Sequence, residues 1–158
     1  MAQAVKAKKS SVKIDKNYYE GVGRRRTSVA RVRVYHAKKA GVTIDDVSYK
    51  PGAYIVNNQE ITKWAQTLAD AAILKKPLFV LGDEATFVVY AKVTSGGAKG
   101  QRDAVVHGLA RALANIPIGD VRAKLKAEDL LTRDARTRER RKVGTGGKAR
   151  RLKQSPKR

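Results

Sequence analysis

The sequence of 158 residues contains no cysteine, which excludes disulfide bonds and thiolate metal sites. Histidine is almost as scarce, with His36 and His107 alone, so a histidine-based metal centre or catalytic cluster is not expected. No Ser/His/Asp constellation or pair of carboxylates can be assembled from the remaining scattered acids. The sequence therefore predicts no catalytic residues, no metal, no cofactor and no enzymatic activity.

Long apolar runs are also missing. The longest, AAIL and FVVYA, are far shorter than the ~20 residues that a membrane-spanning helix needs. The first sixteen residues, MAQAVKAKKSSVKIDK, have no apolar segment of the kind found in secretory signals. We expect no membrane partner and a cytoplasmic location, with an organellar one left open.

Acidic residues are few, and this is the strongest signal in the composition. The chain has 35 Lys+Arg against 14 Asp+Glu, a formal net charge of +21. A field of this sign attracts polyanions, either nucleic acid or an anionic membrane surface, and composition alone does not separate the two. Residues 133–158 carry twelve basic and two acidic residues, and residues 1–17 carry five lysines and one aspartate. We expect a flexible basic extension over 1–17, a globular α/β domain over 18–131, to which the family resemblance described below assigns RNA binding, and an extended basic tail over 132–158.

Alternating apolar residues predict the strands of the central domain. In residues 28–37, Ala30, Val32 and Val34 share one face, while arginines occupy the other. Residues 18–23 are expected to pair with this strand through a turn at Arg24–Thr27. Further strands are expected at 53–56, ended by the turn-prone pair Asn57–Asn58, and at 85–93, the most hydrophobic of all and therefore central.

Helical spacing follows two of these strands. Ile61, Trp64, Ala65 and Leu68 predict a helix that AAILKK extends or restarts until Pro77 breaks it. A second helix is expected from about residue 101 to 115, with an apolar stripe running from Val105 to Ile116. A short final helix is expected near 119–126. Trp64 is interpreted as core or partial core, with stacking on a base as the alternative.

Two glycine-rich segments resemble phosphate loops. In GTGGK, the P-loop glycine and the hydroxyl after the lysine are replaced by Lys142 and Ala149, so the nucleotide interpretation fails. SGGAKGQ at 95–101 lies between an expected strand and helix, where free backbone N–H groups favour an anion. No second parallel strand is expected after that helix, so a dinucleotide fold is not completed. A plain turn and a contact to an RNA phosphate both remain open there.

Clustered arginines give the other candidates. GRRRTS at 23–28 is either a solvated turn or a nucleic-acid contact, and the latter is favoured because three like charges repel unless a polyanion neutralises them. His107 and Arg111, four residues apart, either join the same surface or bond to neighbouring backbone. Residues 132–142 form either a lone surface helix or a segment that becomes ordered on RNA.

Three blocks resemble a known family: YYEGVGRRRTSVARVRV (18–34), TSGGAKGQRDAVVHGLARAL (94–113) and TRDARTRERRKVG (132–144). Together they resemble the ninth protein of the small ribosomal subunit, in its bacterial or organellar form. The resemblance implies a two-layer α/β (α+β) sandwich like the second domain of ribosomal protein five, with a mixed sheet and a left-handed β-α-β crossover. It also implies a structural function within the ribosome.

The resemblance further implies partners and contact residues. The partners are the ribosomal RNA of the small-subunit head, neighbouring head proteins, and transfer RNA in the peptidyl site, whose anticodon stem-loop the tail reaches. The tail-tip residues that match the tRNA contact are Lys157 and Arg158. The residues expected to bind ribosomal RNA, from the basic patterns and the resemblance together, are Arg24, Arg25, Arg26, Arg31, Arg33, Lys99, Gln101, Arg102, His107, Arg111, Arg133, Arg136, Arg138, Arg140, Arg141, Lys142, Lys148, Arg150, Arg151 and Lys153.

Two other functions remain as alternatives. One is a non-ribosomal architectural protein that binds nucleic acid in general. The other is a nucleotide-dependent enzyme that uses SGGAKGQ. The tail itself departs from the family pattern, because Ser155 and Pro156 stand where an aromatic residue and a serine are usual.

Overall fold

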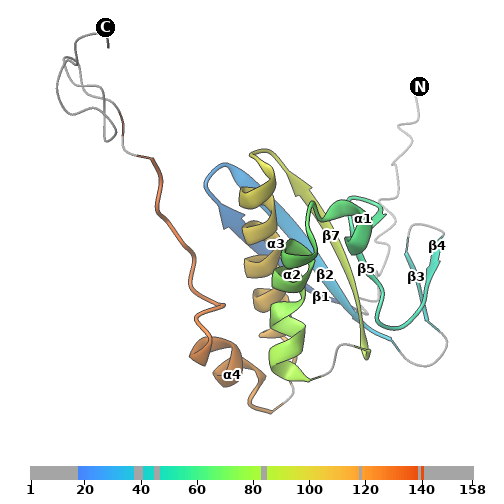
Figure 1. The fold of residues 1–158 in the computed structure, drawn as a ribbon. Coiled ribbons are helices and arrows are strands. Elements are labelled where there is room, and N and C mark those ends of the chain that lie inside the picture. The colour runs from blue at the N-terminus through green and yellow to red at the C-terminus, as the bar shows by residue number, and fades with distance from the viewer. Residues whose placement is uncertain are drawn as a thin grey trace, which may run out of the picture.

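The computed structural model describes residues 18–37, 41–44, 47–82, 85–117, 119–138 and 140. The described elements form a mixed sheet with helices against one face and a small separate hairpin (Figure 1). In chain order they are β1 (Tyr18–Arg25), β2 (Ser28–His36), β3 (Val42–Ile44), β4 (Val47–Tyr49), β5 (Tyr54–Val56), β6 (Gln59–Glu60), α1 (Ile61–Trp64), α2 (Leu68–Leu81), β7 (Phe87–Thr94), α3 (Ala98–Leu113) and α4 (Val121–Ala127).

The main sheet has the order β1-β2-β7-β5-β6. All its pairs are antiparallel except β5 with β7, which is parallel. The predicted hairpin of β1 and β2 is confirmed, with Arg25 opposite Ser28 at its turn. The central position of β7 and the turn at Asn57–Asn58, where both residues have positive φ, are confirmed as well.

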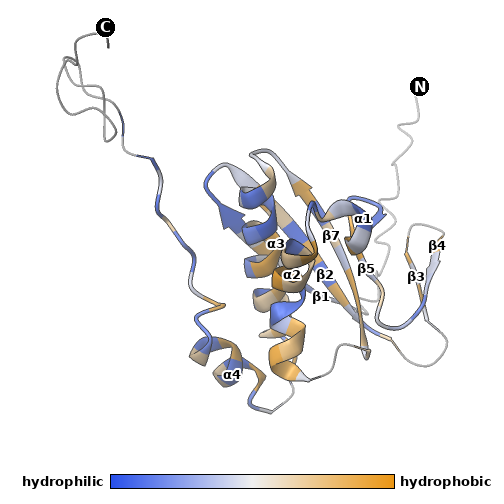
Figure 2. Cartoon of the chain, in the orientation of Figure 1, coloured by the Kyte–Doolittle hydropathy of each residue, from blue (hydrophilic) through white to orange (hydrophobic). Residues whose placement is uncertain are grey.

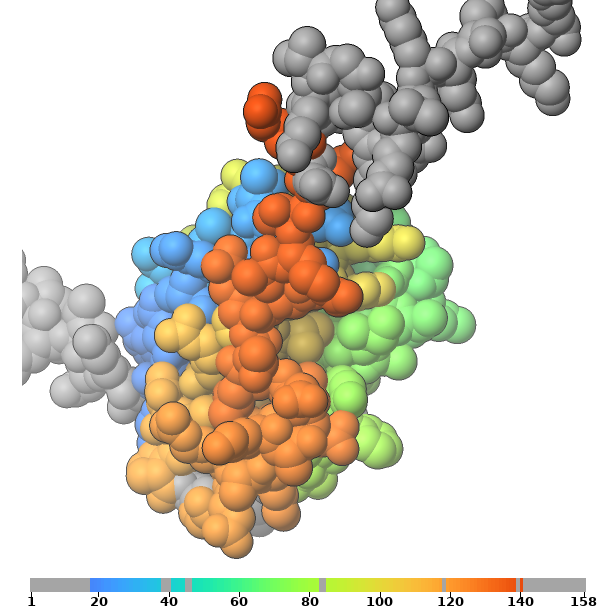
Figure 3. Space-filling model, turned by 90° about the vertical axis from the view of Figure 1, so that its left-hand side faces the viewer, coloured from blue at the N-terminus to red at the C-terminus, as the bar shows by residue number. Residues whose placement is uncertain are grey.

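The connection between β5 and β7 is left-handed. After β5 the chain passes through α1 and α2 on the near side of the sheet and returns as β7 to the left of β5 (Figure 1). The view from the side agrees, because it places α2 and the blue strands β1 and β2 at opposite edges of the molecule (Figure 3). Most parallel crossovers are right-handed, so this feature is unusual, and it confirms the expectation from the resemblance.

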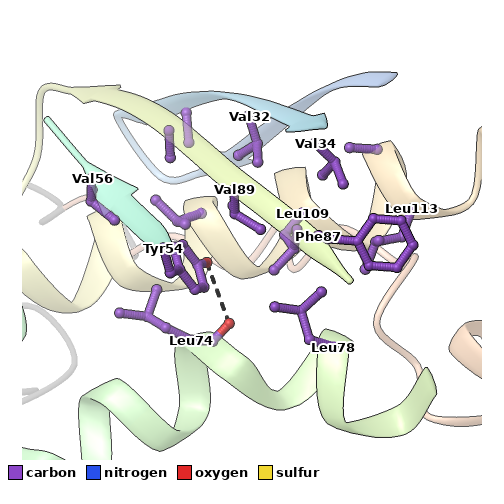
Figure 4. Packing of buried hydrophobic residues seen from close by; sticks show 14 of the residues in the cluster. Val32, Val34, Tyr54, Val56, Leu74, Leu78, Phe87, Val89, Leu109 and Leu113 are labelled. Atoms are coloured by element: carbon purple, nitrogen blue, oxygen red, sulfur yellow. Dashed lines mark hydrogen bonds between the residues drawn. The ribbon is translucent and has the colours of Figure 1, made fainter. Parts of the chain in front are cut away.

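The core lies between the sheet and the helices α2 and α3. Ala30, Val32 and Val34 of β2 are fully buried, as their alternation predicts. They belong to one cluster with Leu109 and Leu113 of α3. Figure 4 shows Val32 and Val34 on the same side of the sheet as these leucines and the side chains of α2. The hydroxyl of Tyr54 donates to the carbonyl of Leu74 at 3.4 Å, and burial raises its pKa, so the phenol stays neutral. Trp64 is partly buried against the same core, as expected.

Strand β1 and helix α3 pack backbone to backbone. A Cβ atom at Gly23 would overlap the carbonyl oxygen of Ala104 and the backbone of Gly108. A Cβ at Gly21 would likewise overlap the backbone of Gly108 and Ala112. The glycines of YYEGVG are therefore required by close approach, which holds α3 tightly against the edge of the sheet.

The predicted break at Pro77 is wrong. Helix α2 continues through Pro77 to Leu81 and ends at Gly82, which has φ 78°. Proline in a helix interior costs ~3 kcal/mol through the lost hydrogen bond and the clash with the preceding turn. Here Pro77 is buried together with Leu74 and Leu78, and this packing offsets the local cost.

The hairpin of β3 and β4 was not predicted from the sequence. Both strands are three residues long, too short for a clear alternation. Ile44 packs with Ile55, Val88 and Tyr90, which lie on the sheet face opposite the helices. This second small cluster covers part of that face, and none of its members in the described part of the chain comes from β1.

Candidate nucleic-acid interface

Three segments far apart in the sequence meet at one end of the domain. Figure 2 shows that the β1–β2 turn and the extended segment after α4 are strongly hydrophilic. We call this region the hairpin end and define it as residues 24–28, 95–102 and 133–138. The hydroxyl of Ser28 donates to the carbonyl of Ser95 at 3.0 Å, and the amide of Gln101 donates to the same carbonyl at 3.1 Å. These bonds hold the turn against the glycine-rich loop, with an open hollow of about 310 Å³ between them.

The root of the tail crosses α3 and reaches the hairpin end. Residues 133–138 have no regular secondary structure, so the lone surface helix is not formed over these residues. That the segment becomes ordered on RNA stays a prediction. In the space-filling view the segment lies along the surface between the blue hairpin and the helices (Figure 3).

Arg25 fixes this segment in place. Its Nη1 donates to the carbonyls of Arg136 at 2.7 Å and of Asp134 at 3.4 Å. Its guanidinium also pairs with the carboxylates of Asp134 at 3.1 Å and Asp103 at 3.7 Å. The side chain is only 11% exposed. Arg25 therefore uses its fork of donors inside the protein and has little surface left for RNA.

Arg136 continues the same arrangement from the tail itself. Its side chain and its backbone N–H both hydrogen-bond to the carboxylate of Asp134. These bonds, with the nearby charge of Arg25, lower the pKa of Asp134 well below its usual range. The carboxylate stays ionised and holds both cations at the start of the tail.

His107 joins the tail root to β1 through its two ring nitrogens. Nε2 lies 3.3 Å from the carbonyl of Leu131, and Nδ1 accepts the backbone N–H of Arg24 at 3.4 Å. A carbonyl only accepts, so these partners require the neutral ring with the proton on Nε2. Burial lowers the pKa of His107, and the charges of Arg111 and Arg133 lower it further. His107 therefore bonds to neighbouring backbone, which is the second of the two interpretations that the sequence left open for it.

Arg102, another predicted contact, is largely occupied within the domain. Its guanidinium donates to Asp70 at 2.7 Å and to Asp103 at 2.7 Å, and its side chain is 20% exposed. The bond from Arg102, with one from Thr67, lowers the pKa of Asp70. The pair joins α3 to the first turn of α2. Arg111 is similarly engaged, donating to the carbonyl of Val22 at 2.6 Å.

Arg31 and Arg33 lie elsewhere, on the sheet face opposite the helices. Both pair with Glu20 of the neighbouring strand, at 3.3 Å and 3.5 Å. The guanidinium of Arg33 also lies over the ring of Tyr18, 4.9 Å from its centroid. Because Arg31 is 63% exposed, its pairing is weak and the charge stays accessible. The structure does not bring these two residues to the hairpin end.

The remaining predicted cations in the described part of the chain are accessible to a binding partner. Their side chains are exposed, and none makes an ion pair with another described residue. They are Arg24, Arg26, Lys99, Arg133, Arg138 and Arg140. The predicted contacts Arg141, Lys142, Lys148, Arg150, Arg151, Lys153, Lys157 and Arg158 lie outside the described residues, as does the extension 1–17.

The sequence contained a signal for Arg25 that the arginine run concealed. Strand alternation places Arg25 on the same face as Gly21 and Gly23, and that face packs against α3. Arg24 falls on the other face and is exposed. Three consecutive arginines therefore divide into one internal anchor and two surface cations.

Other classes of site are not formed by the described residues. Among them, no three His, Asp or Glu side chains are grouped so that they could hold a metal ion. No helix in the described ranges is long and apolar enough to cross a membrane. Beyond α3, the described residues form α4 and a segment without regular secondary structure.

The family model of ribosomal protein S9/S16 matches residues 23–158, which is most of the chain. The chain belongs to the ribosomal protein S9/S16 family. Its resemblance to that family, drawn from three sequence blocks, is thereby confirmed. Membership gives this S9/S16-family chain a structural function in the ribosome, where ribosomal RNA is its partner. The accessible cations of the hairpin end belong to a protein whose surroundings are polyanionic.

Proposed function

We propose that the hairpin end binds ribosomal RNA in the head of the small subunit and that the tail continues from it to tRNA in the peptidyl site. The proposal is carried by the meeting of residues 24–28, 95–102 and 133–138 at one end of the domain. Four exposed arginines and Lys99 there make no ion pair with a described carboxylate, so phosphates are the groups that would neutralise them; the arginines are Arg24, Arg26, Arg133 and Arg138.

Arginine suits this function because its planar guanidinium binds two phosphate oxygens at once and stacks on bases. Internal pairs such as Arg25–Asp134 and Arg102–Asp70 give the surface a fixed shape before RNA arrives. Neighbouring proteins of the subunit head are further partners in this proposal. The function requires no catalysis by this chain.

The length of the tail allows it to contact a distant partner. Its residues 133–158 span at most roughly 85 Å when fully extended at ~3.3 Å each, so the tip need not lie near its target. The basic pair Lys157 and Arg158 would contact the anticodon stem-loop. The backbone entropy lost when the tail becomes ordered is offset only in the assembled subunit, where counterions leave the RNA.

Deleting Ser155–Arg158 tests the division between anchor and tail. We expect the shortened chain to enter small subunits normally in sucrose gradients, while filter binding shows weaker tRNA in the peptidyl site. A matched variant keeps the tail and has Arg24, Arg26 and Lys99 changed to Gln. We expect this variant to enter small subunits poorly. If the shortened chain failed to enter subunits, or if tRNA binding were unchanged, the proposed tail function would be wrong.

A further inference from the structure

A second hollow lies beside Trp64, next to the hairpin end. Its volume is about 200 Å³, and its walls include Trp64, Ala65, Gln66, Asp70, Lys99 and Arg102. Pockets that hold whole small molecules or cofactors are usually larger, ~300–1,000 Å³. The size of this hollow suits one planar ring system instead.

Trp64 gives the hollow an aromatic wall. Part of its side chain packs against the core, and the rest lines the hollow at the end of α1. Indole faces stack on nucleobases whatever the base, and each such contact contributes about 1–3 kcal/mol. Trp64 is also the sole tryptophan in the sequence, so its fluorescence reports on this place alone.

The charges around the hollow favour a nucleotide over an uncharged ring. Asp70 is the acid in the wall, and its carboxylate is already held by Arg102 at 2.7 Å and by the hydroxyl of Thr67 at 2.8 Å. Lys99, by contrast, is exposed and makes no ion pair with any residue that the structure describes. The charge of Lys99 contributes to the lowered pKa of Asp70, but Lys99 is not bonded to that carboxylate. The wall therefore carries one cation outside an ion pair beside one aromatic ring.

The hollow adjoins the one between the β1–β2 turn and the glycine-rich loop. The two hollows share Ala98 and Lys99 as lining residues. Arg26 also lines the hollow between the turn and the glycine-rich loop. A phosphate held between Arg26 and Lys99 would place its own nucleoside at the mouth of the Trp64 hollow. RNA proteins commonly read single-stranded or bulged nucleotides by such splayed-out bases.

We propose that the hollow beside Trp64 takes one unstacked nucleobase of RNA, with Lys99 holding the phosphate of the same nucleotide. The inference rests on the proposed function, since the hairpin end must bind RNA for the base to reach the hollow. It adds a base-stacking contact to a surface otherwise described by phosphate contacts.

Tryptophan fluorescence of the full chain tests the inference. We expect a short single-stranded RNA to quench Trp64, and inorganic polyphosphate, which has no bases, to bind without comparable quenching. Trp64→Leu should weaken RNA binding about 5-fold or more, the lower end of the stacking range, and Trp64→Phe should largely restore it. Circular dichroism melts show whether each variant is folded.

Lys99→Gln should weaken binding but keep the full quench at saturation. Lys75→Gln is the same change at an exposed lysine of α2 away from the hollow, and it should alter neither the RNA affinity nor the quench. The inference is overturned if polyphosphate quenches Trp64 as strongly as RNA does, or if folded Trp64→Leu binds RNA as well as the unchanged chain. Failure of the chain to bind either polyanion would instead contradict the proposed function, and the inference with it.

Discussion

Arg25 donates a hydrogen bond of 2.7 Å to the carbonyl of Arg136, which lies 111 residues further along the chain. The bond joins the first hairpin of the domain to the root of the tail. Because Asp134 and Asp103 hold the same guanidinium, the direction in which the tail leaves the domain is set by β1 and α3. The tail thus begins from a fixed point, although it is built from polar residues that have no core of their own.

Replacing Arg25 by lysine should release the tail root. An ammonium keeps the charge but cannot contact two carbonyls and two carboxylates with the geometry of a planar fork. We expect a loss of about 1.5–3 kcal/mol in the free energy of unfolding, the range for hydrogen bonds to charged groups. Urea unfolding measures the loss, and hydrogen exchange at the Arg136 amide reports the release.

The control for this change is Arg26→Lys, at the exposed neighbouring residue of the turn. It should leave both the stability and the exchange of the Arg136 amide unchanged. Equal effects of the two substitutions would mean that Arg25 does not anchor the tail.

A methyl group at Gly23 should disrupt the contact between β1 and α3. Gly23→Ala places a Cβ inside the van der Waals radius of the Ala104 carbonyl, and backbone on both sides cannot move away easily. We expect destabilisation of at least about 3 kcal/mol, at the upper end for overpacking. Gly97→Ala is the matched control, because a Cβ there meets nothing within 4 Å. Thermal melts that shift equally for both variants would show that the close packing is not required.

The fold could be predicted from the sequence more fully than the candidate site. Alternation in β2 and the apolar run of β7 predicted the sheet, because period and burial are local properties of a strand. The continuation of α2 through Pro77 could not be predicted, because the burial of Pro77 with Leu74 and Leu78 is a tertiary property that local propensity does not contain.

The candidate site was predicted as a set of cations but not as an arrangement. Composition identifies which residues are basic, whereas only the fold shows that Asp103 and Asp134 meet Arg25 while Arg26 meets no acid. Ion pairs between residues 78 or 109 positions apart leave no local pattern in the sequence. The hollow beside Trp64 is likewise formed by different parts of the chain, the end of α1 with the first turn of α2 and the start of α3.

Stability should fall as the pH drops from about 7 to 5, because of His107. Its pKa in the fold lies below the ordinary value of 6.5, so the unfolded chain binds the proton more readily. The contribution of neutral His107 is complete above about pH 6.5 and is lost progressively as the pH falls toward the lower pKa of the fold. Protonation would also place a hydrogen on Nδ1. That hydrogen would face the N–H of Arg24 and remove the hydrogen bond that Nδ1 now accepts.

The measurement is the free energy of unfolding in urea at several pH values, for the unchanged chain and for His107→Gln. The variant has no titrating group at this position, so its curve should be flatter between pH 7 and 5. Parallel curves would show that His107 is not responsible for the decrease.

Binding to single-stranded RNA should distinguish the accessible cations from the paired ones. Each phosphate contact that is lost should reduce the slope of log affinity against log salt by about 0.7. We expect this reduction for Arg26→Gln, because Arg26 is exposed and unpaired among the described residues. Arg102→Gln should leave the slope nearly unchanged while lowering stability, because its guanidinium is bonded to Asp70 and Asp103 and the change leaves those carboxylates without their partner. Both substitutions remove one positive charge, so the net charge of the chain cannot explain a difference between them. If Arg102→Gln reduced the slope as much as Arg26→Gln does, Arg102 would have to leave its carboxylates to bind RNA, and the division between anchoring and accessible arginines would be wrong.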